Sequence, residues 1–131
     1  MPKRKPLRGT ASVETAICLP IATLLLLGTL ESTSMIHLRK SLVITAYEAA
    51  RTSVIPGARE TDVQAAANQM LADRQVTGST VNVTPSNFET AAVGDLIRID
   101  VTAPCDPNAF LPTVFFRGQT IQVTAQAMKE Y

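Results

Sequence analysis

The stretch RGTASVETAICLPIATLLLLGTLE, residues 8–31, decides how this chain is organised. Between Arg8 and Glu31 only Glu14 carries a charge. As a helix, these 22 residues would extend about 33 Å at about 1.5 Å per residue, close to the thickness of one hydrocarbon core. The stretch therefore predicts a membrane span, which we assign to residues 10–30.

Charge is distributed unevenly along the chain. The 131 residues are 46% apolar and 18% charged, and this composition excludes a disordered tail or a coiled coil. The net charge of +1 argues against nucleic-acid binding. The first eight residues, however, contain four bases and no acid: Lys3, Arg4, Lys5 and Arg8. Lys and Arg gather on the cytoplasmic flank of a span. We therefore predict a basic cytoplasmic leader (1–9) and an extracytoplasmic domain (31–131), on a single-pass protein of the cytoplasmic membrane.

A helical pattern continues beyond the span. Two adjacent apolar stripes follow Glu31, the first made of Met35, Leu38, Leu42, Ala46 and Ala49, the second of Ile36, Val43, Tyr47, Ala50 and Val54. The strong stop signal Pro56-Gly57 comes next. We predict one helix from Ala11 to Val54, kinked locally at Pro20, because proline removes a backbone hydrogen bond. This wide apolar face can pack against the sheet, and part of it can pack against neighbouring subunits, because two adjacent stripes exceed what one small sheet needs to cover.

The remaining elements predict an α+β domain with a pilin-like architecture. A second helix begins near Thr61, which forms an apparent capping box with Gln64, and ends before Gly78. Alternating apolar and polar residues at 81–83, 96–103 and 120–127 then predict a small antiparallel three-stranded sheet that lies on the helices. The proline-containing connection before the last strand is expected to hold a helical turn at Phe110–Phe116.

The sequence offers no chemistry for an enzyme. His37 is the only histidine, so neither a His-based triad nor a multi-histidine metal site can form, and we predict no catalytic residue, metal or cofactor. Cys18 and Cys105 are expected to remain separate thiols, because a bridge would have to join the span to the outer domain. We expect Tyr47 and the Phe115-Phe116 pair to lie in the core.

Glu14 discriminates between interpretations of the N-terminus. A charge inside a span costs a few kcal/mol even on the gentler scales. A secretory signal peptide lacks support, since no small-residue cleavage site follows the apolar run. A lipoprotein signal at Cys18 fails because the apolar run follows that cysteine. An unprocessed single-pass anchor, whose outer domain binds a partner, explains the span but leaves the acid unexplained.

A family resemblance accounts for the acid. The string RGTASVE places Gly9 five residues before Glu14, as at the cleavage site of type IV pilin-like precursors. The wider stretch resembles the opening of TadE-like proteins, minor pseudopilins of tight-adherence (Tad/Flp) systems. The residues that match that family are Gly9, Val13, Glu14, Ala16, Leu19, Pro20, Leu24 to Leu27, Gly28 and Glu31, and Thr15 stands where an aromatic is usual.

The resemblance implies a structural role in adhesion and secretion. A prepilin peptidase would cut after Gly9, making Thr10 the new N-terminus and Glu14 the fifth mature residue. Val13 and Glu14 would then act in recognition and assembly, with Glu14 pairing with the free α-amino group of a neighbour. The implied partners are the peptidase, other Tad pilins and pseudopilins, the inner-membrane assembly platform and the lipid bilayer.

Overall fold

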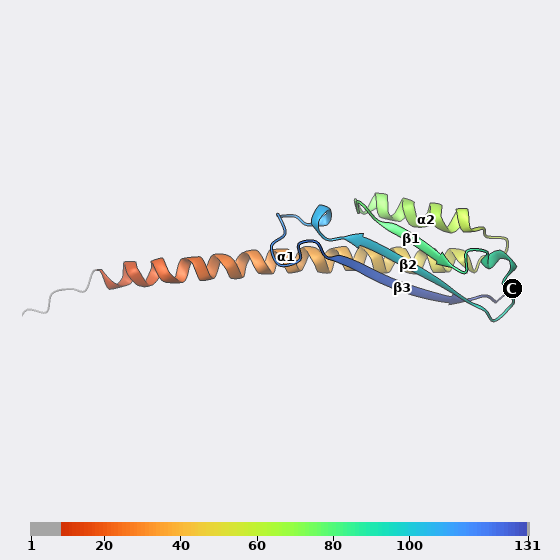
Figure 1. The fold of residues 1–131 in the computed structure, drawn as a ribbon, viewed down its shortest axis with the longest axis horizontal. Coiled ribbons are helices and arrows are strands. Elements are labelled where there is room, and N and C mark those ends of the chain that lie inside the picture. The colour runs from red at the N-terminus through yellow and green to blue at the C-terminus, as the bar shows by residue number, and fades with distance from the viewer. Residues whose placement is uncertain (1–8, 131) are drawn as a thin grey trace, which may run out of the picture.

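The computed structural model describes residues 9–130 and confirms the α+β class (Figure 1). In chain order its elements are helix α1 (Thr10–Ser53), helix α2 (Glu60–Asp73), strand β1 (Thr80–Thr84), the 3-10 turn η1 (Phe88–Thr90), strand β2 (Leu96–Pro104), the 3-10 turn η2 (Asp106–Asn108) and strand β3 (Thr120–Met128). Most of the predicted leader, residues 1–8, lies outside the described residues.

Helix α1 is a single helix with two different environments. Its bounds agree with the prediction to within one residue at each end, and the chain turns at Gly57, where φ is +80°. The first half projects alone from the domain, whereas the second half runs beside the sheet (Figure 1). The helical assignment passes through Pro20 without a break. The local kink at Pro20 stays a prediction.

The three strands form an antiparallel sheet in the order β1-β2-β3. The central strand β2 pairs Ile99 with Val83 on one side and with Ala125 on the other. Side chains alternate along β2 as the sequence predicts, and the four that face the helices are fully buried: Ile97, Ile99, Val101 and Ala103. The sheet therefore has one apolar face, which needs a helical cover.

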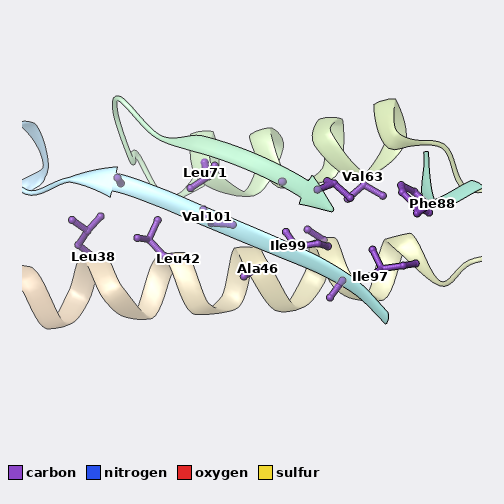
Figure 2. Close-up of a cluster of buried hydrophobic side chains, with 14 residues drawn as sticks. Leu38, Leu42, Ala46, Val63, Leu71, Phe88, Ile97, Ile99 and Val101 are labelled. Atoms are coloured by element: carbon purple, nitrogen blue, oxygen red, sulfur yellow. The ribbon is translucent and has the colours of Figure 1, made fainter. Parts of the chain in front are cut away.

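The core lies between this face and the two helices (Figure 2). Every residue of the first α1 stripe is buried, from Met35 at 5% exposure to Ala49 at 0%. Helix α2 closes the other side of the core with Val63, Ala67 and Leu71. The second half of α1 is thus fixed to the sheet by burial of apolar surface, the dominant favourable term in folding.

The prediction that Tyr47 and Phe115 belong to the core was wrong, since Tyr47 is 70% and Phe115 58% exposed. Tyr47 belongs to the second stripe of α1, in which Ile36 and Val43 are exposed as well. Ala50 of this stripe is buried, but the sheet leaves Ile36, Val43 and Tyr47 uncovered, because β3 is its last strand and β3's own apolar side chains are only half-buried. Phe116 is half-buried.

Two local predictions were also wrong. Helix α2 is capped by Asp62, whose carboxylate accepts the backbone N–H of Arg59 at 3.0 Å, whereas Gln64 donates to the Glu60 carboxylate at 3.0 Å. An ionised acid in the first turn also suits the positive end of the helix dipole. The turn expected at 110–116 lies earlier, at η2, where Pro107 fits the first positions of a short helix.

Candidate membrane and assembly interface

The first half of α1 presents its apolar side chains to the surroundings. All residues from Thr10 to Leu27 are exposed, including Val13 at 60% and Leu25 at 67%. Within residues 9–130, α1 is the one helix that is long and apolar enough to cross a membrane, with a mean hydropathy of 1.9 over its most apolar window. Such a surface is stable in contact with lipid and costly in contact with water.

The residues predicted for cleavage and recognition lie together where α1 begins. Gly9 is the N-cap, and its carbonyl accepts the N–H of Val13 at 3.4 Å. Gly9, Thr10, Val13 and Glu14 line one shallow hollow on the helix, which Ile17 completes. The structure therefore places these four residues on one side of the first turns, with the Gly9–Thr10 peptide bond at the start of the helix.

Glu14 differs from the threonines of this region. The hydroxyls of Thr15 and Thr23 donate to the carbonyls of Ala11 and Leu19, both at 2.8 Å, so their polarity is satisfied within the helix. Within residues 9–130 the Glu14 side chain has neither a hydrogen bond nor an ion pair. If this part of α1 lies in lipid, such an ionisable group needs a partner.

Glu31, which follows the span, binds the loop between β2 and β3. The Glu31 side chain is 5% exposed. It accepts the N–H of Phe116 at 2.8 Å and that of Val114 at 3.0 Å through Oε1, and the N–H of Phe115 at 3.2 Å through Oε2. Burial by itself raises the pKa of Glu31, but these three donors outweigh it and hold the pKa below its ordinary value of 4.5. Glu31 is therefore an ionised anchor for this loop.

The loop also lies directly against the span. A Cβ placed on Gly28 would be 3.5 Å from Cε2 of Phe115, so the ring rests on the helix where it has no side chain. The resemblance noted Gly28 and Glu31 as matching positions, but the sequence carried no sign of this contact. The donors that Glu31 binds come 83 to 85 positions later in the chain, and local patterns do not report such contacts.

A second carboxylate closes the loop on itself. Asp106 accepts the Thr113 hydroxyl, and it also accepts the Gly118 N–H at 2.9 Å. The bond from Thr113 has the largest effect and that from Gly118 adds to it, so the pKa of Asp106 is held below its ordinary value. Beside it Cys105 is buried, and within the described residues both Cys105 and Cys18 are free thiols, as predicted. The loop is thus a folded unit with fixed attachment points on α1.

The same helix carries the similarity to known proteins. Residues 9–51 match the family model of TadE-like proteins. The TadE-like segment spans almost all of α1, about a third of the chain, and it confirms the resemblance carried by residues 8–31. No curated protein and no solved structure matches the chain. A TadE-like segment on a helix that could cross a membrane fits a membrane-anchored component of a Tad pilus.

Proposed function

We propose that this chain is a minor pseudopilin of a Tad-type pilus or secretion system, cut by a prepilin peptidase after Gly9. Residues 10–30 span the cytoplasmic membrane, the leader lies in the cytoplasm, and residues 31–131 lie outside. The observation that carries the proposal is the TadE-like segment, which begins at Gly9 and includes a carboxylate, Glu14, that has no partner within residues 9–130.

Cleavage would create the partner that Glu14 lacks. Cutting the Gly9–Thr10 bond frees an α-amino group, which has an ordinary pKa near 8 and is positively charged at neutral pH. Thr10 and Glu14 are four residues apart, or about 6 Å along the helix axis. A parallel neighbouring helix shifted by about that distance would bring its Thr10 ammonium level with Glu14. The two charges would then pair inside the membrane, where neither is stable alone.

The outer half of α1 supplies a second contact surface for assembly. Ile36, Val43 and Tyr47 follow one another at intervals of seven and four residues and are 60%, 46% and 70% exposed. This spacing keeps them on one side of the helix. Exposed apolar stripes of this kind are typical of helices that pack against another helix. A neighbouring subunit anchored in the same membrane would approach along this stripe.

The proposal is tested by replacing Glu14 in the native host and measuring co-purification with the other pilus components. Glu14→Leu removes the charge and favours simple insertion, so the variant is expected to remain in the membrane but to lose its partners. Glu14→Gln, which keeps the shape, is expected to do the same. Leu24→Ala is the matched control in the same span. If Glu14→Leu retains all partners, the assembly role fails, and the unprocessed single-pass protein becomes the better account.

A further inference from the structure

We propose that the tip of the β2–β3 loop, Val114 and Phe115, is a lipid-binding surface that enters the outer interface of the bilayer crossed by α1. The inference rests on the membrane insertion included in the proposed function, and it does not depend on cleavage or on assembly. The tip would give the protein a second point of attachment to the membrane, beside the span.

The level of the tip along α1 is the first argument. Phe115 rests on Gly28, and it lines one hollow together with Leu24 and Leu25 of the apolar run. Gly28 lies 18 positions after Thr10, or about 27 Å along a helix, and the hydrocarbon core is about 30 Å thick. With Thr10 at the cytoplasmic boundary, the Phe115 ring is therefore at the level of the outer boundary.

The chemistry of the tip is the second argument. Val114 is 70% and Phe115 58% exposed, and Phe115 lies next to the exposed Leu24 and Leu25 of α1. The loop folds down along α1 toward the projecting half of the helix (Figure 1). Exposed apolar groups gathered in one place mark an interaction surface. Because this surface is continuous with the membrane-facing part of α1, lipid is the occupant that covers both.

The third argument is that the backbone N–H groups of the tip already have hydrogen-bond partners within the chain. Irregular backbone is tolerated at membrane depth only where its polar groups have partners. Glu31 accepts the N–H groups of Val114, Phe115 and Phe116, so three successive donors of the tip are satisfied within the chain. A loop surrounded by water would not need a buried carboxylate for this purpose. The bonds to Glu31 therefore fit a tip that leaves water.

The chain contains no tryptophan, so a single introduced Trp reports its own surroundings. We would reconstitute the full chain carrying Phe115→Trp into phosphatidylcholine vesicles whose acyl chains are brominated at a shallow or a deep position. Leu19→Trp, near the middle of the span, is the control for insertion. Val93→Trp is the control for water, because Val93 is 68% exposed in the turn before β2. Val114→Trp repeats the test without altering the Phe115–Gly28 contact.

We expect Phe115→Trp and Val114→Trp to be quenched several-fold more strongly than Val93→Trp, and more by the shallow bromines than by the deep ones. Leu19→Trp should show the opposite preference. If Leu19→Trp is quenched but both loop variants resemble Val93→Trp, the inference is overturned and the membrane span stands. If Leu19→Trp is not quenched either, the proposed membrane span is overturned together with the inference. Loop tryptophans in an apolar environment that no lipid quenches would show that protein covers the tip, which also overturns the inference.

Discussion

Oε1 of Glu31 accepts the backbone N–H of Phe116 at 2.8 Å, joining two residues 85 positions apart. This bond, together with those to Val114 and Phe115, attaches the β2–β3 loop to α1 immediately after the apolar run. The sheet is therefore fixed to α1 through the core and, by way of this loop, through Glu31. The orientation of the domain relative to the projecting half of α1 follows from these attachments rather than from a flexible linker.

Replacing Glu31 with Gln should release the loop while leaving the fold intact. The amide has one acceptor oxygen and brings two N–H groups toward backbone donors, so the three bonds cannot all be kept. We expect several-fold faster hydrogen exchange at the amides of Val114–Phe116, with exchange in β2 unchanged. Glu48→Gln is the matched control on the same helix, because the Glu48 side chain forms no such bonds within residues 9–130. Equal exchange in the two variants would contradict the anchoring role of Glu31.

Attachment of the loop should weaken in acid. The pKa values of Glu31 and Asp106 both lie below their ordinary values of 4.5 and 3.8, so the folded loop binds fewer protons than the detached loop. The stabilisation is therefore complete above about pH 4.5 and is lost as the pH falls through the two folded-state pKa values. Hydrogen exchange at residues 114–118, followed from neutral pH down to about pH 3, should speed up in this window beyond the intrinsic effect of pH.

The matched variant for this pH dependence is Glu31→Gln combined with Asp106→Asn, which removes both titrating groups. Its exchange at residues 114–118 should be fast throughout and should follow only the intrinsic pH effect. A wild-type loop that stays fully protected at the lowest pH, or a double variant with the wild-type profile, would contradict the assignment.

The two apolar stripes of α1 should respond differently to truncation. Leu42 is 0% exposed between the helices and the sheet, so Leu42→Ala should lower the free energy of unfolding by about 2–5 kcal/mol. Ile36 lies on the uncovered stripe, and Ile36→Ala should change it by less than about 0.5 kcal/mol. Denaturant unfolding of the full chain in detergent micelles measures both values. Similar losses in the two variants would show that the second stripe is also part of the core.

Cys105 should be chemically inert while the domain is folded. Burial raises the pKa of its thiol, and the carboxylates of Asp106 and Glu31 raise it further, so the reactive thiolate is scarce. In a Cys18→Ser variant, where Cys105 is the only thiol, iodoacetamide should react only after denaturation. Val93→Cys, in a background lacking both native cysteines, provides the exposed control. Alkylation of native Cys105 at the rate of this control would contradict its burial.

Much of the fold was predictable because its signals are local. The unbroken apolar pattern that ends at Pro56-Gly57 fixed α1 to within one residue, and the alternation in 96–103 identified β2 and its buried face. The exposure of Tyr47 was not predictable. It depends on how much of the α1 surface the sheet covers. The apolar periodicity of a helix gives no information about the width of the sheet that packs on it.

The candidate site was predictable in part for the same reason. Gly9, Val13 and Glu14 belong to one short motif, and the TadE-like match confirms the family resemblance of the segment that contains it. The role of Glu31 was not predictable, because its partners are backbone N–H groups that no side-chain pattern reveals. Phe115 was misplaced because a buried aromatic residue and an exposed one look alike in a sequence.

The central claim is that the chain is processed after Gly9, and the most direct test is the mass of the mature protein. The protein would be extracted from the membrane of its native host, its intact mass measured and its N-terminus read by tandem mass spectrometry, with Gly9→Leu analysed in parallel. We predict a chain that begins at Thr10, about 1 kDa lighter than the 14.0 kDa full chain, and an uncut Gly9→Leu variant. A wild-type chain that still begins at Met1 or Pro2 would contradict the account.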